Sequence, residues 1–242
     1  MGEAKISSQL IHKLSPQLPT GVATYLKEYF QTAPDWLLST LKPLKLKKNH
    51  IFIRESDPAD TIYLLVSGIV KAIDFRFYGN AYDYMWFYPV NCFGGLEVLL
   101  EQTHYQTTLS TVTPCILLVI PRNLFEQWIT QDIRVLRMEA KAMGSLLLEE
   151  VKRERIFLFM QGSDRLTYTL LHLYEHTAGP NGCMLHLTQQ NLADSTGLSV
   201  KTVSRSLKDM EQSELIVRSG YRISISEEQY QQMKHLIRQN YE

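Results

Sequence analysis

The side chains with the clearest chemical purpose lie between residues 188 and 208, where hydroxyl, amide and cationic groups recur among apolar ones. From Ser195 to Lys208 the charged residues are Lys201, Arg205 and Lys208, and no carboxylate lies among them. An arginine can donate two hydrogen bonds to O6 and N7 of guanine in the major groove, and a lysine can neutralise a phosphate. These residue types therefore predict a surface that contacts double-stranded DNA.

Two short helices joined by a tight turn would place these side chains on one face. Thr188 and Ser199 are suitable N-caps, because a hydroxyl oxygen can accept a hydrogen bond from a first-turn N–H. Gly197 permits the positive φ of a sharp turn between the helices. The face expected to be buried comprises Leu198, Val203, Leu207 and Met210. The predicted DNA contacts are Thr188, Gln189, Ser199, Val200, Lys201, Thr202, Ser204, Arg205 and Lys208. The alternative is an ordinary helical hairpin with a solvated polar face.

The following segment, residues 215–225, is expected to form a β-hairpin around Ser219-Gly220. Arg218 and Arg222 flank the tip, and the segment contains no acidic residue. A helix-turn-helix followed by a basic hairpin is a winged helix, and its wing is suited to contact phosphate. Both arginines are therefore added to the predicted DNA-binding residues.

The overall charge limits how far this argument reaches. The 242-residue chain has a formal net charge of zero, and from Ser163 onward it has eight Lys/Arg against nine Asp/Glu residues. DNA binding would therefore depend on local charge distribution rather than on a basic domain. No apolar run is long enough for a membrane span, and the N-terminal residues do not resemble a secretion signal. We expect a cytoplasmic protein with no membrane partner.

The first half of the chain has a different periodicity. Residues 1–43 predict two short helices, at 22–30 and 35–41, and residues 44–122 predict about six to eight short strands separated by turn residues. Such a pattern favours an antiparallel β-roll or barrel with room for one small ligand. The expected fold class is α+β, with domain boundaries at 1–122, 123–160 and 161–242.

Residues 123–160 are expected to form one long helix with a narrow apolar stripe. The stripe follows heptad spacing and consists of Ile133, Leu136, Ala140, Met143 and Leu147. A stripe of this width suits a two-stranded coiled coil, so a homodimer is predicted. The alternative is a helix packed only on its own roll. Gly162-Ser163-Asp164 is expected to end this helix, act as a hinge and cap the next helix.

The three cysteines, Cys92, Cys115 and Cys183, do not have the spacing of a metal or iron–sulfur site. No metal is therefore predicted. A reversible Cys92–Cys115 disulfide and three buried thiols are both open at this stage.

The order of these parts resembles the cAMP receptor protein/fumarate-nitrate regulator (CRP/FNR) superfamily over roughly residues 40–230. The most specific piece is LTQQNLADSTGLSVKTVSRSLKDMEQSELI. The resemblance implies a homodimeric transcription regulator whose roll senses a signal, and it implies that Ser204 and Arg205 touch bases. Lys201 stands where the fumarate-nitrate branch commonly has an acid. The resemblance also implies contact with RNA polymerase through residues 176–186, which suggests an activator.

The sensor departs from the family pattern. Members that bind cyclic nucleotides carry Gly-Glu-Leu followed, about nine residues later, by Arg-Ser. Here Gly94 and Leu96 match, Gly95 replaces the glutamate, and Tyr105-Gln106 replaces Arg-Ser. An anionic phosphate buried without a cation is costly, so no tight cAMP binding and no cofactor are expected. The candidate effector pocket is Gly94, Gly95, Leu96, Tyr105, Gln106, Leu146 and Glu150.

Three readings of the sensor stay open. Eight aromatic residues between Phe75 and Tyr88 could be roll core, or they could line a pocket for an apolar or aromatic metabolite. Regulation by protein abundance, without any ligand, is the third. An enzyme is not expected, because the sequence has no HExxH, P-loop or GxGxxG motif. The other alternative is a ligand- or partner-binding module that never reads DNA.

Overall fold

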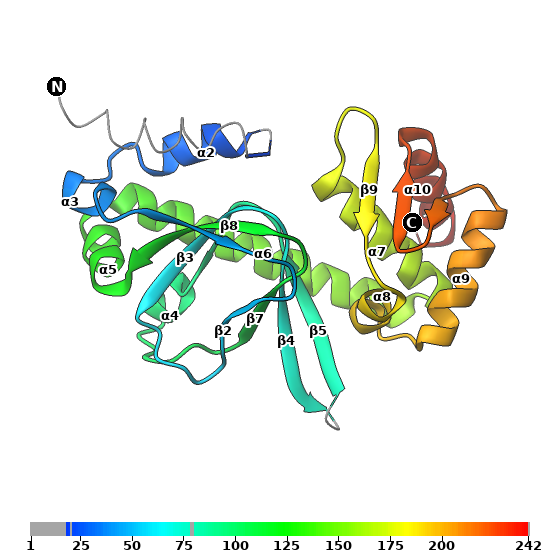
Figure 1. Ribbon diagram of the computed structural model, residues 1–242, viewed down its shortest axis with the longest axis horizontal. Helices are drawn as coiled ribbons and strands as arrows, with labels where there is room; N and C mark the ends of the chain where they lie inside the picture. Colours follow the sequence, from blue (N-terminus) through cyan, green and yellow to red (C-terminus); the bar gives the residue numbers. More distant parts are fainter. Residues whose placement is uncertain (1–17, 20, 78–79, 242) are drawn as a thin grey trace. The chain divides into compact units, whose positions relative to one another are not determined.

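The computed structural model describes residues 18–19, 21–77 and 80–241 (Figure 1). The chain forms two compact units. The first contains the described residues up to Asp74 together with Met85–Glu149, and the second contains the described part of Phe75–Tyr84 together with the residues from Glu150 onward. An antiparallel roll, a long helix and a winged helix follow one another along the chain, which confirms the expected α+β class.

Two short helices precede the roll. Helix α2 spans Val22–Tyr29 and helix α3 spans Asp35–Leu38, so both end slightly before the residues that the sequence predicts. The apolar side chains of these helices are buried in one cluster with side chains of the roll and of helix α5 (Arg122–Gln131). In that cluster Tyr29 meets Trp128 edge to face, with ring centroids 5.4 Å apart.

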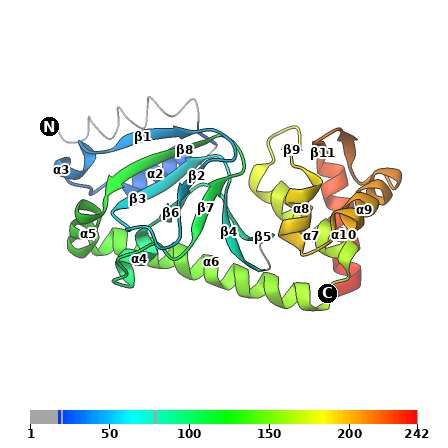
Figure 2. The same ribbon diagram turned by 60° about the horizontal axis from the view of Figure 1, so that its bottom comes forward.

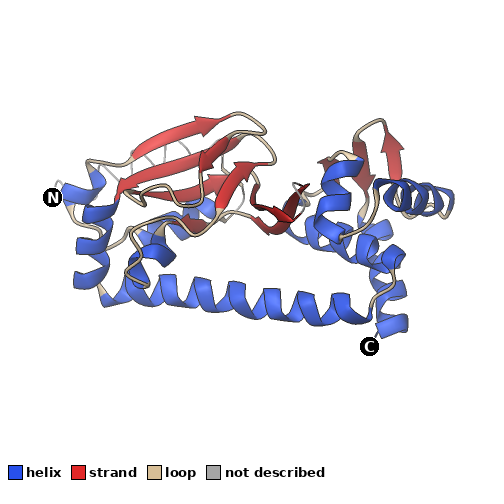
Figure 3. Cartoon of the chain, turned by 90° about the horizontal axis from the view of Figure 1, so that it is seen from below, coloured by secondary structure: helices blue, strands red, loops and turns tan. Residues whose placement is uncertain are grey.

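The roll consists of two four-stranded antiparallel sheets. The first has the order β1 (Lys42–Leu46), β8 (Cys115–Pro121), β3 (Thr61–Ser67) and β6 (Asn91–Phe93). The second has the order β2 (Ile51–Ile53), β7 (Thr108–Thr111), β4 (Val70–Phe77) and β5 (Asn80–Phe87). Strands concentrate in this roll, and a small separate sheet lies among the helices of the second unit (Figure 3).

Strand β3 is buried on both faces. Ile62, Leu64 and Val66 belong to the cluster that contains the N-terminal helices, whereas Leu65, on the other face, is also fully buried. Because side chains alternate across a strand, a strand covered on both sides loses the polar–apolar alternation. The first sheet therefore lies between the helix cluster on one side and the roll interior on the other.

The single helix expected over residues 123–160 is two helices. Helix α5 ends at Gln131, and helix α6 spans Ile133–Phe159 (Figure 2). Asp132 separates them, because its carboxylate accepts hydrogen bonds from the backbone N–H groups of Arg134 at 3.0 Å and Val135 at 3.4 Å. An N-capping aspartate starts a new helix in this way. None of the described helices is both long and apolar enough to cross a bilayer.

The second unit is a winged helix. Its elements are α7 (Gly162–Thr177), β9 (Cys183–His186), α8 (Gln189–Thr196), α9 (Val200–Gln212), β10 (Val217–Ser219), β11 (Arg222–Ile225) and α10 (Glu227–Tyr241). The three strands form a sheet in the order β10-β11-β9. The N-cap of α7 is Gln161, and no side chain makes a capping hydrogen bond there, so the cap expected from Ser163-Asp164 is wrong.

Strand β9 and helix α10 are additions to the sequence-based expectation. Helix α10 packs on α7 through Tyr230, whose ring stacks on that of Tyr174 with centroids 4.5 Å apart. The Tyr230 hydroxyl donates to Glu175 at 2.7 Å, and the Tyr174 hydroxyl donates to Glu227 at 2.8 Å. These reciprocal contacts fix the last helix against the first helix of the unit.

We predict that two glycines in the turn before β9 differ sharply in their tolerance of alanine. Gly182 has φ +87°, and a Cβ there would lie 2.4 Å from the carbonyl oxygen of Ile225. Gly182→Ala should therefore lower the free energy of unfolding by about 1–3 kcal/mol. Gly179, which exchanges both backbone hydrogen bonds with Gly182, has no atom within 4 Å of the corresponding position.

Gly179→Ala is accordingly the matched control and should stay within about 0.5 kcal/mol of wild type. Urea unfolding of both variants, followed by circular dichroism, measures the difference. Equal midpoints for the two variants would contradict the assigned backbone geometry.

Candidate nucleic-acid interface

The first helix of the predicted helix-turn-helix begins where the sequence indicates. Thr188 is the N-cap of α8, and its Oγ1 accepts the backbone N–H of Asn191 at 3.1 Å. The Asn191 side-chain oxygen accepts the backbone N–H of Thr188 at 3.2 Å, which completes a reciprocal capping box. Thr188 and Gln189 are both half-buried at this helix start.

The turn between the helices is also confirmed. Gly197 has φ +69°, in the left-handed region that only glycine adopts without cost. Ser199 is the N-cap of α9, and its Oγ accepts the backbone N–H of Thr202 at 3.1 Å. The two hydroxyls of Ser199 and Thr202 lie 2.8 Å apart and are hydrogen-bonded to each other. The predicted contact residues at this helix start are therefore held by the cap.

Helix α9 separates its two faces as expected. Val203, Leu207 and Met210 are buried, and Ser206 is buried with them. Leu198 lies before the helix and is half-buried, with its Cδ2 3.0 Å from the position of a Cβ on Gly162 of α7. The opposite face is accessible. Lys201, Arg205 and Lys208 are exposed, Val200 is 37% exposed, and Thr202 and Ser204 are half-buried.

The wing has one arginine available and one already paired. Ser219 and Arg222 face each other across the β10–β11 hairpin, and Arg222 is exposed. The Arg218 guanidinium instead lies 3.7 Å from the carboxylate of Glu211 at the end of α9. Arg218 must exchange this carboxylate for a phosphate if it is to contact DNA.

Sequence reasoning missed Tyr221 at the tip of the wing. Its side chain is 74% exposed, and it follows Gly220, whose φ is +60°. An aromatic side chain on a short basic hairpin was the available signal, because aromatic rings with a polar end are suited to nucleic-acid surfaces.

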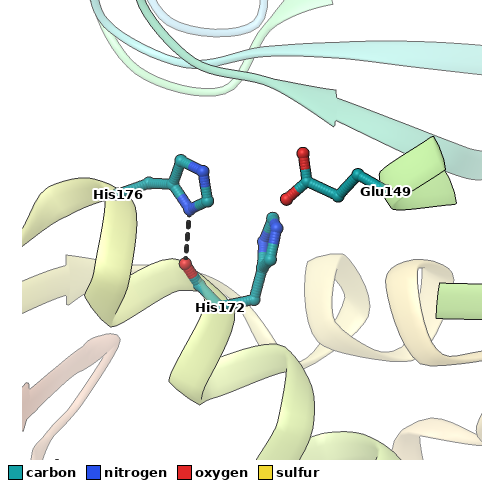
Figure 4. A group of neighbouring side chains, drawn as sticks. All are labelled: Glu149, His172 and His176. Carbon is teal, nitrogen blue, oxygen red and sulfur yellow. Dashed lines mark hydrogen bonds between the residues drawn. The ribbon is translucent and has the colours of Figure 1, made fainter. Parts of the chain in front are cut away.

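Helix α7 carries a pair of histidines one turn apart, His172 and His176 (Figure 4). Their ring centroids are 4.4 Å apart, and Nδ1 of His176 is hydrogen-bonded to the carbonyl oxygen of His172 at 2.8 Å. Two imidazoles at this spacing can face one ion, but a structural zinc site uses four ligands. We assign no metal site to this pair alone.

In the roll, Tyr105 and Gln106 of the sensor cassette are hydrogen-bonded to other residues of the roll. Tyr105, in the position of the family arginine, is buried and donates a hydrogen bond from its hydroxyl to the carbonyl oxygen of Thr61 at 2.6 Å. The backbone N–H of Gln106 donates to the carboxylate of Glu97 at 3.1 Å. Glu97 is only 6% exposed. It belongs to the short helix α4 (Gly95–Leu99), and the sequence analysis missed it.

The two glycines of the cassette are required for space. Gly94 has φ +88°, and a Cβ there would lie 2.9 Å from the Thr61 carbonyl oxygen. A Cβ on Gly95 would lie 3.0 Å from Sγ of Cys92. The structure therefore brings Gly94 and Tyr105 together at the carbonyl oxygen of Thr61, the first residue of β3.

The remaining candidate pocket residues have different environments. Leu96 is 45% exposed, Gln106 is exposed, and Leu146 is half-buried. Glu150 forms an ion pair of 2.5 Å with Arg153. Of the aromatic residues, Trp86, Phe87 and Tyr88 are buried, as roll core would be. Tyr78 lies outside the described residues, and the side chains of the others, at 75–84, are not described.

The cysteines are free thiols rather than a disulfide. Burial raises the pKa of Cys115 and of Cys183 to about 11, and it holds the pKa of Cys92 well above its usual value. All three are therefore protonated near neutral pH and are poor nucleophiles. Cys115 and Cys183 are buried as expected, whereas Cys92 is half-buried.

Helix α6 exposes an apolar stripe that differs partly from the predicted dimer seam. Ile133 is 69% exposed and Leu147 is 64% exposed, and Ala140 is exposed between them. Leu136 and Met143 are half-buried, and Cε of Met143 lies 3.6 Å from the position of a Cβ on Gly95 of the roll. Gly144 and Leu148 are exposed on the same side of α6 as Ile133, Ala140 and Leu147.

Comparison with known proteins gives a consistent result. A cyclic nucleotide-binding domain model matches residues 43–132, and a Crp-like helix-turn-helix domain model matches residues 164–230. The cAMP-activated global transcriptional regulator CRP of Pasteurella multocida is 24% identical over 194 residues, which cover 79% of this chain and 93% of that protein.

Solved structures show the same fold. The structure of FixK2 from Bradyrhizobium japonicum matches with a TM-score of 0.69 at 19% identity, covering 81% of this chain and 96% of that one. The c-di-GMP responsive global regulator CLP of Xanthomonas campestris matches with a TM-score of 0.64 at 23% identity, covering 78% and 95%.

Proposed function

This chain belongs to the CRP/FNR family of DNA-binding transcription regulators, and from that premise we propose that it reads a two-fold symmetric DNA site as a homodimer. The observation that carries the proposal is the exposed cationic face of α9, opposite the buried Val203, Leu207 and Met210. Two such helices would enter successive major grooves about 34 Å apart.

Within this face the residues have different roles. We propose that Arg205 and Ser204 contact base edges and that Lys201 and Lys208 contact phosphate. The caps at Thr188 and Ser199 each satisfy one first-turn N–H group, and the other N–H groups of these helix starts could donate to phosphate oxygens. Arg222 and Tyr221 of the wing would contact the backbone beside the site.

We predict that two alanine variants of α9 lose DNA affinity in different ways. Arg205→Ala should weaken binding to a site selected from random sequence by about 1–3 kcal/mol and relax the base preference at one position. Lys208→Ala should weaken binding to all sequences and reduce the slope of log affinity against log salt by about one.

Lys27→Ala is the matched control, because it removes an exposed cation from α2. Fluorescence anisotropy over a salt series, after selection of bound DNA from a random pool, measures all three variants. Unchanged specificity in Arg205→Ala would show that another face reads the bases. Failure of the wild type to enrich any sequence would favour a module that binds only ligands or partners.

The apolar stripe on α6 supports the homodimer. Ile133, Ala140 and Leu147 repeat at seven-residue spacing and are exposed in the single chain. Gly144 has no atom within 4 Å of a Cβ position, so a second helix can approach closely there. A parallel pair of α6 helices would bury this stripe by packing of the coiled-coil type.

We predict that Leu147→Glu shifts the protein from dimer to monomer, because paired carboxylates cannot be buried in such a seam without cost. Ser145→Glu is the control, since Ser145 is exposed on the side of α6 away from the stripe. Light scattering coupled to gel filtration measures the mass. A monomeric mass for the wild type at micromolar concentration would contradict the proposed dimer.

We also propose that the effector is not cAMP and that no tightly bound cofactor is needed. The family resemblance assigns the phosphate to the Arg-Ser pair, which is Tyr105-Gln106 here. The Gln106 N–H is already hydrogen-bonded to the Glu97 carboxylate. The Tyr105 hydroxyl is bonded to Thr61, so neither position offers a cation to an anionic ligand.

Isothermal titration calorimetry with cAMP should accordingly show no binding tighter than about 1 mM, since the loss of a buried charge-assisted contact costs several kcal/mol. Micromolar affinity for the wild type would contradict the proposal. The cAMP-activated regulator CRP of Pasteurella multocida serves as the positive control.

RNA polymerase is the proposed protein partner. The segment between α7 and α8 includes exposed residues at 178–181 and an exposed Met184 on β9. The family resemblance assigns this segment to polymerase contact, which would make the protein an activator. The relative from Pasteurella multocida is a transcriptional regulator. We propose that this chain likewise acts by binding and not by catalysis.

A further inference from the structure

A carboxyl group is buried inside the first unit where three elements meet. Glu139 of α6 is 3% exposed. The Tyr29 hydroxyl of α2 donates a hydrogen bond to Oε1 of Glu139 at 2.5 Å, and the Cys92 thiol of β6 is also hydrogen-bonded to this carboxyl group. One side chain of the long helix therefore joins the N-terminal helix and the roll.

In the described part of the chain, no lysine, arginine or histidine forms an ion pair with Glu139. Arg134, one turn earlier on α6, is directed elsewhere: its guanidinium donates to the carbonyl oxygens of Glu28 at 2.6 Å and Tyr29 at 2.9 Å. The buried carboxyl group thus has two neutral donors and no cation, an arrangement that disfavours its ionised form.

The protonation states around it follow from burial. Burial raises the pKa of Glu139 above the usual 4.5, and the hydrogen bonds from Tyr29 and Cys92 oppose that rise only in part. The pKa values of Tyr29 and Cys92 are held well above their usual values. Burial is the largest cause, and the negative charge of neighbouring groups is the next. Both neighbours therefore stay protonated, and Glu139 is the group of the cluster that titrates first.

The unusual cassette residue belongs to the same cluster. A Cβ on Gly95 would lie 3.0 Å from Sγ of Cys92 and 3.4 Å from Oε2 of Glu139. A glutamate at position 95, as in the family cassette, would put a second carboxylate against the first. The glycine at position 95 is therefore compatible with a buried Glu139, whereas the glutamate of the family pattern is not.

From this arrangement we propose that the regulator has a proton-binding site at Glu139, and that the proton is an effector which biases how α2 and β6 pack on α6. The proposal rests on the proposed function for its effect on DNA. When Glu139 releases its proton, a negative charge appears beside Tyr29, whose ring packs on Trp128 in the helix cluster. The protonated form favours the packed arrangement, and the ionised form weakens it.

The groups that face the site come from each element. Helix α2 contributes Tyr25 and Tyr29, and β6 contributes Cys92. Glu28 of α2 acts on Tyr25, and the Arg134 guanidinium of α6 donates to the backbone of α2 instead. The pKa of Tyr25 is raised to about 12, chiefly by burial and next by Glu139. None of the tyrosines or the thiol changes charge between pH 5 and 8, so Glu139 controls the pH response of this cluster.

The sign of the response follows from the raised pKa. Stability associated with neutral Glu139 is complete below the unfolded-state pKa of about 4.3 and is lost as pH rises through the higher folded-state pKa. Asp132 has a lowered pKa, because hydrogen bonds led by that from Thr32 outweigh its burial. Its contribution has the opposite sign and is lost as pH falls, so the Glu139 effect must be measured as a difference between variants.

The experiment compares thermal unfolding of the full chain as wild type, Glu139→Gln and Glu126→Gln from pH 4.5 to 8.5. Glutamine keeps the shape and an acceptor for Tyr29 but cannot ionise. The midpoint of Glu139→Gln relative to that of wild type should rise by about 2–5 °C for each pH unit between the unfolded-state pKa of about 4.3 and the higher folded-state pKa, and should stay constant above the latter. The exposed Glu126 on α5 serves as the control and should give a constant offset.

A pH-independent difference between wild type and Glu139→Gln would overturn the proton site. Tyr29→Phe is the second variant, in case Glu139→Gln fails to fold. It removes one donor to the carboxylate and so raises the folded-state pKa further, and the loss of stability should continue to a higher pH than in wild type. No movement of that end point would also contradict the proposal.

The effector role has its own measurement. Affinity for the selected DNA site should change several-fold across pH 4.5 to 8.5 in wild type, after correction by Glu126→Gln, and this change should be absent in Glu139→Gln. A thermal difference with identical pH profiles for DNA would leave a proton site without an effector role. If no variant bound DNA at any pH, the proposed function and the effector role would fail together, and the thermal result would stand separately.

Discussion

Helix α9 can present its cations only because its other face is fixed in an apolar core. Val203 and Leu207 are almost completely buried, so rotation of the helix about its axis would expose apolar area and bury charge. That constraint determines which side chains face outward, and the caps at Thr188 and Ser199 determine where each helix begins. The hairpin and α10 then complete the core beneath it, with Tyr230 stacked on Tyr174. The reading surface is thus a consequence of packing, and charge only defines what that surface recognises.

The sensor obeys a related constraint. A partly buried backbone N–H requires an acceptor, and in this roll the acceptor for Gln106 is the protein's own Glu97. A buried hydroxyl requires a partner as well, and Tyr105 uses a carbonyl oxygen of β3. Both polar groups are therefore satisfied by the protein itself. The carboxyl group of Glu139 lies in an environment that favours its neutral form.

Sequence reasoning succeeded where local chemistry determines the structure. The caps, the glycine turn and the faces of α9 follow from residue type and spacing, and all are present in the structure. It failed where tertiary contacts decide. Asp132 resembles any polar residue in a helical run until its carboxylate is seen to cap α6. Glu97 and Glu139 were missed, because their burial depends on elements distant in sequence. Arg218 reads as a phosphate contact, because its pairing with Glu211 brings together two elements. The heptad count likewise could not show that Met143 faces Gly95.

The pairing of Arg218 with Glu211 has a further consequence for how the wing responds to salt. If Arg218 transferred to a phosphate, one cation would leave the DNA, but the vacated carboxylate would attract another from solution. The two ion movements would cancel, whereas Arg222 would displace a cation without any such uptake. The two arginines of the wing would therefore affect the salt dependence differently, and Arg218 could strengthen binding without making it more sensitive to the ionic composition of the cell.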